Sequence, residues 1–303
     1  MHKSVLLKEV MDGLDMEDGD IYFDATVGSG GHMEEVWKRM GGGVVLLGID
    51  ADETSLSITR AKLDLCGAKA SLAVSNFRNI DKTVENLGLG RPTKILFDLG
   101  WSTDQFEEGG RGFSFQKDEP LLMTFASKAG EEDLTASEVV NDWAEESLAD
   151  VIYGYGEERY ARRIAKAIVK SRKEREIKTS GQLAEIIKKA VPIFYRFGRI
   201  HPATRTFQSL RIAVNDELQA LKEGIDKGFD ILEEGGRMAV ISFHSLEDRI
   251  VKNFFKEKQV EGKLEIINKK PIVPSEKEVS ENPRSRSAKL RIIRKIKMQN
   301  TER

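Results

Sequence analysis

The stretch YFDATVGSGGH, residues 22–32, is the part of the sequence that decides the fold. A short apolar run ends at Asp24, and a cluster of glycines follows before His32 and a helix-like segment. Glycines between a strand and a helix let the backbone approach a ligand closely and leave the first N–H groups of the helix free to bind it. The stretch is therefore typical of a nucleotide-binding turn, although its spacing is not G-x-G-x-x-G.

An acidic residue closes the next predicted strand. The run VVLLGID, residues 44–50, is continuously apolar, as expected for a parallel strand buried on both faces. Asp50 ends this run about 20 residues after Gly28, where a carboxylate binds the ribose hydroxyls of an adenosine group. A tight turn followed by a solvated aspartate is the purely structural interpretation, but the two features together favour an adenosine-containing ligand.

Strand-like and helix-like runs alternate through residues 1–100, with further strand candidates at 70–77 and 93–100. This alternation predicts an α/β fold with a doubly wound, Rossmann-like sheet. From about residue 106 it gives way to helical stretches, at 135–150, 157–175 and 180–190, and a strand returns only at 235–243. We therefore predict one domain formed by residues 1–105 and 205–303, interrupted by a helical insertion at 106–204.

The residue before the glycines bears on which nucleotide is bound. A carboxylate at Asp24 suits a ligand with a positive amine better than one with a pyrophosphate. S-adenosylmethionine carries an amine and a sulfonium but no phosphate, so the pattern favours it over NAD and makes an NAD-dependent oxidoreductase the weaker alternative. The sequence contains no G-x-x-x-x-G-K-[ST] motif, which argues against a nucleoside triphosphatase.

The run TKILFDLG, residues 93–100, places Asp98 at the carboxyl end of the fourth predicted strand. In an open α/β sheet the reaction crevice lies outside these strand ends, beside the point where the strand order reverses. We therefore predict that Asp98 orients the amino group that is methylated, and Gln105 is a candidate second contact. A helix N-cap or turn role for Asp98 is the alternative interpretation.

Composition excludes several classes of protein. The chain of 303 residues has a formal net charge of -2, so any nucleic-acid binding must come from local basic patches. It has no apolar run of about 18 residues and no signal-peptide pattern, which predicts no membrane association. The single cysteine, Cys66, rules out an internal disulfide and favours the cytoplasm; we expect Cys66 to pack in the core.

Histidine and serine spacing predicts neither a metal site nor a hydrolase. The histidines at 32, 201 and 244 do not form a metal-ligand spacing with the acids around them, so no metal is expected. Ser245 follows His244 on a predicted strand-to-helix turn, but no G-x-S-x-G surrounds it. Together with Asp248 it forms a capping-box pattern, which explains Ser245 as the start of a helix.

Several stretches together resemble one family. They are HKSVLLKEVMDGL, FDATVGSGGH, DLGWSTDQF, RGFSF, HPATRTFQSLRIAVNDEL, SFHSLEDRIVKNFF and NPRSRSAKLR, and they span nearly the whole chain. This pattern resembles the MraW-type (RsmH) bacterial rRNA cytosine-N4-methyltransferases. The resemblance implies a class I S-adenosylmethionine-dependent methyltransferase fold with an inserted helical domain that recognises the substrate. It also implies methylation of the exocyclic N4 of a cytosine in the decoding region of small-subunit (16S) rRNA.

The resemblance also carries specific site residues. The family's cofactor contacts fall on Gly30, Gly31, His32, Asp50, Phe77, Asp98 and Gln105. Phe77 follows the third predicted strand, where an aromatic ring can cover the face of an adenine. The implied partner is small-subunit rRNA within the assembled or assembling 30S subunit; the sequence does not predict an oligomeric state.

Two segments depart from the family pattern. The family usually reads D-L-G-V-S-S-x-Q, where this chain has Trp101 and Thr103. It usually reads L-D-M-R-M-D after R-G-F-S-F, where residues 121–126 are LLMTFA. The resemblance therefore does not carry the roles of those charged residues to this chain. A ribosome- or RNA-binding homologue with weak or no activity stays open for this reason.

Cytosine N4 chemistry and the basic patches give the remaining candidates. An acceptor for the N4–H, such as Asp98, favours amine methylation, whereas C5-methylation needs a cysteine nucleophile. Candidate substrate contacts are Trp101, Arg205, Arg284, Arg286 and Lys289, because arginines and lysines bind phosphates and an aromatic ring can stack on the target base. A DNA amino-methyltransferase is the other enzymatic alternative, disfavoured because no Pro-Pro-aromatic run follows Asp98.

Overall fold

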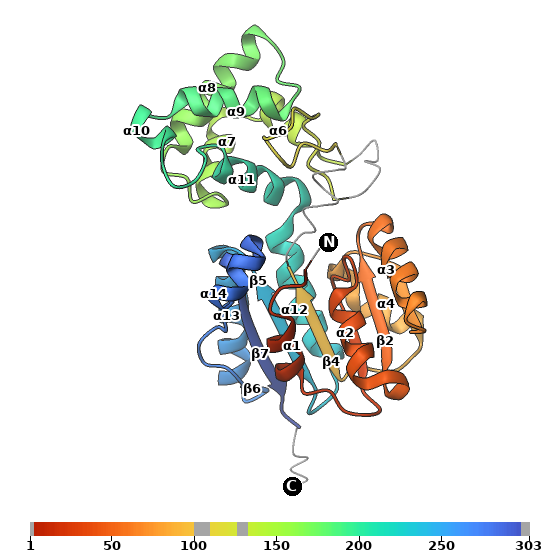
Figure 1. The fold of residues 1–303 in the computed structure, drawn as a ribbon. Coiled ribbons are helices and arrows are strands. Elements are labelled where there is room, and N and C mark those ends of the chain that lie inside the picture. The colour runs from red at the N-terminus through yellow and green to blue at the C-terminus, as the bar shows by residue number, and fades with distance from the viewer. Residues whose placement is uncertain (1–2, 100–109, 126–132, 298–303) are drawn as a thin grey trace. The chain divides into compact units, whose positions relative to one another are not determined.

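The computed structural model describes residues 3–99, 110–125 and 133–297. The chain divides into two compact units (Figure 1), one formed by Met1–Ser102 with Leu218–Arg303 and the other by Thr103–Glu217. The predicted insertion at 106–204 ended before the helix Thr204–Asn215, which belongs to the second unit. The apolar periodicity of that helix joins smoothly to the next one in sequence, so the pattern alone did not mark the boundary.

The first unit contains a seven-stranded sheet in the order β3-β2-β1-β4-β5-β7-β6. The strands are β1 Ile21–Asp24, β2 Val45–Asp50, β3 Ala70–Val74, β4 Lys94–Asp98, β5 Arg237–Ser242, β6 Leu264–Ile266 and β7 Lys289–Lys295. The first five are parallel, and β7 is antiparallel to both β5 and β6. This is the class I methyltransferase topology, with the strand order reversing between β1 and β4.

Side-chain alternation in the strands builds two cores, one on each face of the sheet. Tyr22, Leu46 and Leu96 pack on one side, while their neighbours Phe23, Leu47 and Phe97 pack on the other. The first core is covered by α1 Leu7–Leu14, α2 Gly31–Met40 and α3 Glu53–Leu65, and the second by α4 Ile80–Leu87, α12 Glu217–Ile231 and α13 Ser245–Val260. Helices on both faces explain why these strands are so uniformly apolar.

Several short helices and one short strand were not predicted from the sequence. Residues 268–289 contain α14 Glu276–Glu281 and the 3-10 helix η3 Pro283–Ser287, and β6 was not predicted at all. The further 3-10 helices are η1 Gly41–Gly43 and η2 Phe77–Asn79. The N-cap of α13 is His244, paired with Glu247 in a capping box, and not Ser245 with Asp248 as predicted. A histidine ring nitrogen accepting the helix N–H was not anticipated.

The core placement predicted for Cys66 is wrong. Cys66 is exposed at the C-cap of α3, and its thiol donates to the backbone carbonyl of Leu63. Helix α3 ends one residue earlier than its pattern suggested, because Gly67 adopts a left-handed φ of +70°.

The second unit is helical where it is described. Its helices are α6 Ala136–Asp142, α7 Glu145–Gly154, α8 Ala161–Glu174, α9 Ser180–Ala190, α10 Ile193–Arg196 and α11 Thr204–Asn215. The stretches RGFSF and HPATRTF meet here, because the Phe115 ring stacks on His201 with centroids 4.4 Å apart and packs edge-on against Phe207. These two parts of the sequence therefore have a structural reason to occur together.

The segment LLMTFA is part of the core of this unit. Leu121 and Met123 are fully buried, and Met123 has a left-handed φ of +55°. Asn215 holds the segment, because its side chain accepts from the N–H of Phe125 at 2.8 Å and donates to the carbonyl of Met123 at 2.8 Å. Ala126 lies outside the described residues. Leu121 and Met123 keep the family's apolar residues, whereas the family's charges fall at 122, 124 and 126. Of the residues that replace them, Thr124 is buried and Leu122 is half-buried, so both contribute to packing.

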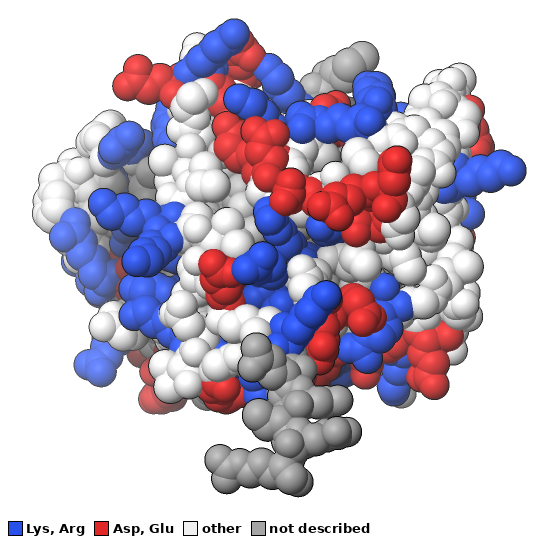
Figure 2. Space-filling view, turned by 90° about the horizontal axis from the view of Figure 1, so that it is seen from below, with Lys and Arg blue, Asp and Glu red and all other residues white. Residues whose placement is uncertain are grey.

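Charge is mixed over the surface in view in Figure 2, where basic and acidic side chains alternate. This distribution agrees with the formal net charge of -2. Within the described ranges, no helix combines the length and the apolar composition that crossing a bilayer requires.

Candidate active site

The glycine turn is held between β2 and β4, the two neighbours of β1 in the sheet. The N–H of Ala25 donates to the carbonyl of Leu96 in β4 at 2.9 Å, and that of Val27 donates to Ile49 in β2 at 3.0 Å. The turn is thus fixed from both sides at the carboxyl edge of the sheet. A ligand crevice is expected at this edge of an open α/β sheet.

Asp50 lies at this edge and receives backbone N–H groups from two directions. Its carboxylate accepts from Gly28 at 2.8 Å and from Asp52 at 2.9 Å. Burial raises the pKa of Asp50, and these backbone hydrogen bonds oppose the rise. Because a carboxylate offers about four lone-pair sites, two bonds leave it able to accept from ribose hydroxyls.

Packing within the protein also requires glycine at Gly30 and Gly31, the positions predicted to contact the cofactor. Gly30 has a φ of +72° as the N-cap of α2, and a Cβ there would lie 2.7 Å from the methyl group of Thr59. Thr59 in turn donates to the carbonyl of Gly28 at 2.9 Å. A Cβ on Gly31 would collide with the hydroxyl of Ser4. The helix N-terminus can therefore approach a ligand only because these positions carry no side chain.

His32 links the N-terminal segment to the end of β4. Its Nε2 lies 3.1 Å from the carbonyl of Val5, and its Nδ1 lies 3.7 Å from Oδ2 of Asp98. Because a carbonyl oxygen only accepts, Nε2 carries a proton, and the other ring nitrogen faces the carboxylate. The Val5 carbonyl therefore fixes both the orientation and the tautomer of the His32 ring.

Asp98 is positioned by its own backbone as well as by His32. Its N–H donates to the hydroxyl of Thr26 in the glycine turn at 2.7 Å. The Asp98 side chain retains 16% of its accessible surface. The end of β4 and the glycine turn therefore form one rigid unit, in which a partly accessible carboxylate lies next to the helix N-terminus.

Asp24 lies beneath the turn, with only 1% of its surface exposed. Its carboxylate accepts from the Tyr22 hydroxyl and from the N–H of Thr26, both at 3.1 Å. Burial raises the pKa of Asp24 to about 7, and burial also raises the pKa of Tyr22 well above its usual range. Asp24 can therefore act on a ligand's ammonium through its charge, but not by direct contact in this arrangement.

Phe77 opens the 3-10 helix η2 beyond β3. Its ring meets that of Phe97 edge-on with centroids 6.0 Å apart, and a Cβ on Gly224 of α12 would lie 2.7 Å from it. The glycine in α12 therefore lets the half-buried aromatic ring settle at the same carboxyl edge of the sheet as Asp50.

The structure thus gathers most of the predicted cofactor contacts at one edge. Gly30, Gly31, His32, Asp50, Phe77 and Asp98 all follow the carboxyl ends of parallel strands. Gln105 and Trp101 lie outside the described residues. The hydroxyls of Thr26 and Thr59, which hold the turn, were not predicted, because threonines of this kind carry no sequence signature.

The predicted substrate contacts are dispersed. Arg205 lies in the second unit, on α11, and donates to the backbone carbonyl of Glu157 at 2.9 Å. Arg284 and Arg286 are exposed on η3. Lys289 is the first residue of β7, and its ammonium lies 3.2 Å from Asp248 of α13. The basic residues at 284–289 thus belong to η3 and to the start of β7.

The sequence did not predict that residues 3–6 pack against the start of α2, next to Gly31 and His32. Leu6 is buried with a left-handed φ of +52°, and its N–H donates to Glu278 of α14 at 2.7 Å. Lys3 pairs with Glu281, and its carbonyl accepts from Asn282 at 3.0 Å. Residues 3–6, which we call the N-terminal strap, are thus held by α14. No pattern within residues 1–14 predicts this contact.

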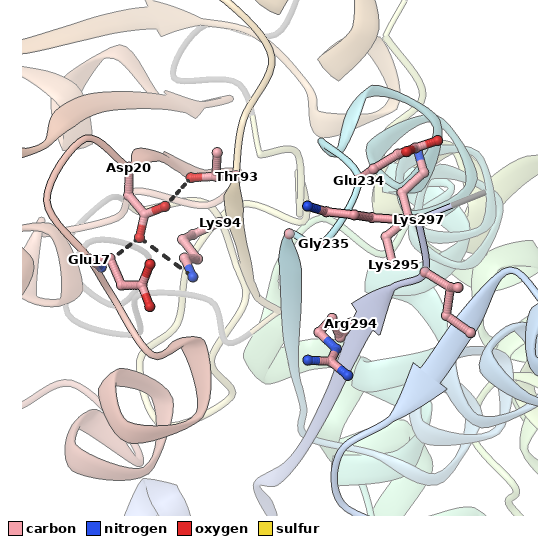
Figure 3. Close-up of a pocket in the computed structure, with 11 residues that line it drawn as sticks. Glu17, Asp20, Thr93, Lys94, Glu234, Gly235, Arg294, Lys295 and Lys297 are labelled. Carbon is pink, nitrogen blue, oxygen red and sulfur yellow. Dashed lines mark hydrogen bonds and ion pairs between the residues drawn. The ribbon is translucent and has the colours of Figure 1, made fainter. Parts of the chain in front are cut away.

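A cavity of about 560 Å³ lies at the opposite edge of the sheet from the glycine turn. Figure 3 shows Asp20 at its wall, bonded to Thr93 at 2.7 Å and to the ammonium of Lys94 at 3.4 Å. Lys295 donates to three carbonyls near the end of α12. These contacts hold the amino ends of β1 and β4 and bind the carbonyls at the C-terminus of α12. The polar residues around this cavity are therefore explained by the stability of the fold.

Comparison with known proteins agrees with this geometry. The sequence profile of the MraW methylase family matches residues 1–296. The chain belongs to the MraW methylase family. Family membership confirms both the predicted fold class and the predicted methyl donor, S-adenosylmethionine.

Curated relatives of this methylase cover nearly its whole length. The protein named ribosomal RNA small subunit methyltransferase H of Persephonella marina is 46% identical over 295 residues, which are 97% of this chain and 99% of the relative. The protein of the same name from Sulfurihydrogenibium sp. is 44% identical over 295 residues, with the same coverage. A solved rRNA methylase from Streptococcus thermophilus matches 98% of this chain and 99% of its own, with 13% identity and a TM-score of 0.45.

Proposed function

We propose that this methylase transfers a methyl group from S-adenosylmethionine to the exocyclic N4 of one cytosine in the decoding region of small-subunit rRNA. The observation that carries the proposal is Asp98 at the point where the strand order reverses: its backbone N–H donates to Thr26, and its partly accessible carboxylate faces His32. The substrate class is supported by the curated relatives, which are named as methyltransferases of ribosomal small-subunit RNA.

The cofactor is assigned to the carboxyl edge of the sheet. Asp50 would accept the ribose hydroxyls, Phe77 would cover the adenine, and the N–H groups of Gly30, Gly31 and His32 would face the methionine end, with Gln105 as a further contact. The fit is favourable because Asp50 has lone pairs to spare and the glycines leave the helix N-terminus open. When bound, S-adenosylmethionine supplies an electrophilic methyl group next to Asp98.

Asp98 is assigned the orienting role in the reaction. The lone pair of cytosine N4 is delocalised into the ring, so the amine is a poor nucleophile until its N–H groups are held. Asp98 would accept one N4–H and turn the nitrogen lone pair toward the methyl carbon; the new N–C bond forms as the S–C bond breaks. The proton lost from N4 passes to the carboxylate or to water. The Val5 carbonyl keeps the His32 ring beside Asp98.

We further propose that the helical second unit recognises the rRNA and that the substrate is the assembled or assembling 30S subunit, in the cytoplasm. Trp101, Arg205, Arg284, Arg286 and Lys289 are the candidate RNA contacts. Lys289 is the weakest of these, since Asp248 already binds its ammonium at 3.2 Å.

Mapping of the methylated nucleoside tests the proposal. The protein is incubated with labelled S-adenosylmethionine and with 30S subunits, naked 16S rRNA or DNA from cells that lack the activity. We expect label on 30S subunits as N4-methylcytidine, at one position in the decoding region. Label at C5, or on DNA alone, would contradict the assignment, and cofactor binding without any label would leave an RNA-binding homologue.

A further inference from the structure

The second unit carries a groove built from arginines and aromatic rings. Its volume is about 420 Å³, and its lining residues are Arg159, Phe194, Tyr195, Gly198, Arg199, Ile200 and Arg205. We call it the arginine–aromatic groove. The sequence places Arg159, Arg199 and Arg205 in basic clusters, but it gives no charge pattern that marks the aromatic residues at 194–197.

Large apolar side chains are exposed beside the basic ones. Phe194 keeps 69% of its surface exposed and Phe197 keeps 84%, and Ile193 is equally open at 69%. The three lie within five consecutive residues at the short helix α10. Soluble proteins rarely expose contiguous apolar groups of this size without using them for binding, so this surface calls for a partner.

The groove is positively charged, since its arginines have no carboxylate partner. Among the described residues, neither Arg159 nor Arg199 has an ion pair within 4.0 Å, and Arg205 uses its guanidinium on a backbone carbonyl. Glu158, next to Arg159 in the sequence, is fully buried and accepts from the Tyr195 hydroxyl at 2.6 Å and from the N–H of Tyr160 at 2.8 Å. Glu158 thus fixes the aromatic wall of the groove.

Arginines continue the surface beyond the groove. Arg159 lies over the rings of Tyr160 and Tyr195, 5.1 Å and 5.0 Å from their centroids. Arg159 also lines a neighbouring hollow of about 310 Å³ with Arg162, Arg163 and the exposed Tyr153. Two adjacent hollows therefore present alternating guanidinium groups and aromatic rings.

This pattern fits single-stranded RNA better than other partners. Guanidinium groups bind the phosphates, and exposed aromatic rings stack on unpaired bases, which a duplex keeps inside its own stack. A protein partner of a basic surface would have to supply acids, and it would not need aromatic rings between the arginines. Resting on the proposed function, we propose that the arginine–aromatic groove binds a single-stranded segment of the rRNA substrate by stacking its bases on Phe194 and Phe197.

Binding of a labelled single strand tests the inference directly. The full-length protein is titrated against a fluorescent RNA of about 12 nucleotides, single-stranded or annealed to its complement. The variants are F194A/F197A and R159A/R199A, and the matched controls in the first unit are L65A, an apolar residue 90% exposed, and K252A, an exposed lysine. All these side chains are exposed enough that thermal unfolding should not change.

We expect F194A/F197A to weaken single-strand binding by about tenfold or more, since stacking contributes substantially for each base. R159A/R199A should reduce the slope of log affinity against log salt by about 0.7 per arginine. The control variants should bind like the wild-type chain. A change below twofold for both groove variants would overturn the inference, as would a shift from dimer to monomer in light scattering that accounts for the lost binding, or an equal loss on the duplex.

Methylation kinetics separate this inference from the proposed function. If both hold, F194A/F197A raises the KM for 30S subunits and leaves kcat within about twofold of the wild type. If the wild-type protein methylates rRNA but the groove variants keep its KM and affinity, the groove inference fails and the proposed function stands. If the wild-type protein methylates no rRNA but loses single-strand binding in the variants, the reverse holds.

Discussion

The carboxyl edge of the sheet and the arginine–aromatic groove solve different recognition problems. At the edge, Asp24, Asp50 and the glycines are held by hydrogen bonds or by packing within the fold. In the groove, Phe194 is exposed, and Arg159 has no ion pair with a carboxylate among the described residues. A small cofactor is recognised by groups fixed in advance, whereas a flexible polymer can be met by separate contacts that each contribute a little.

The comparison predicts different responses to mutation. Groups in the pre-formed edge depend on one another, so one substitution should produce a large loss. Groups in the groove act independently, so losses there should be small and nearly additive. The groove variants F194A/F197A and R159A/R199A supply one side of this contrast. The following experiments supply the other, from the largest expected effect to the smallest.

Asp98→Ala should lower kcat for methyl transfer by about 10²–10³, because it removes the charged acceptor that is proposed to hold N4. Asp98→Asn is the matched variant, since it keeps the shape and the backbone bond to Thr26. Single-turnover methylation and calorimetric cofactor binding measure the two effects separately. A kcat within about threefold of the wild type for both variants would remove Asp98 from the reaction.

Gly30→Ala should lower both stability and cofactor affinity, whereas Gly67→Ala should lower stability alone. Both positions have a left-handed φ, +72° and +70°, which costs an alanine about 1–2 kcal/mol. Only at Gly30 would the new Cβ meet a neighbour, Thr59 at 2.7 Å; nothing lies within 4 Å at Gly67. Urea unfolding and calorimetry should show at least a tenfold loss of affinity for S-adenosylmethionine in Gly30→Ala. Equal affinities would contradict the close approach of this helix to the cofactor.

Asp24→Asn should change how stability depends on pH. The folded-state pKa of Asp24 is raised to about 7 from an ordinary value of 3.8, so the folded chain holds a proton that the unfolded chain loses between these values. Stability from this group is therefore present at low pH and lost as pH rises toward 7. The variant should match the wild type near pH 4 and exceed it above pH 7, by a few kcal/mol at most. Parallel curves across this range of pH would contradict an ionisable Asp24.

Arg286→Ala should have the smallest effect, raising the KM for rRNA about threefold at low salt and hardly at all at high salt. Lys289→Ala should raise it less, because Asp248 already binds that ammonium at 3.2 Å. Methylation assays at two salt concentrations compare the pair. A larger effect for Lys289 than for Arg286 would show that the ion pair opens when RNA binds.

The sequence was sufficient for the parallel strands because they are buried on both faces. Runs such as VVLLGID, residues 44–50, are typical of parallel strands buried on both faces, and the acids that close them then fall at one edge. The three-residue strand β6 was missed because so short an edge strand has no measurable alternation. Helix α14 was missed because its six residues are polar except for Val279 and show no apolar periodicity.

The sequence predicted the residues of the site but not the groups that hold those residues in position. Asp50 and Asp98 follow apolar strands, which is a local signal. The Val5 carbonyl that fixes His32 and the Thr26 hydroxyl that fixes Asp98 are tertiary contacts, and no periodicity encodes them. Likewise Cys66 was expected in the core because it falls near the end of a predicted helix, but it is the exposed C-cap of α3, and no local pattern shows which way a cap residue points.

The N-terminal strap makes completion of the site depend on the order of synthesis. Leu6 and its partner Glu278 are 272 residues apart in the chain. At about 5–20 residues per second, a nascent chain waits roughly 15–55 seconds between making the first and the second. Until then the carbonyl that orients His32 belongs to an untethered end. The growing polypeptide should therefore acquire a finished methyl-donor site only after Glu278 has been translated, so products that stop before α14 would lack the contact that tethers the strap.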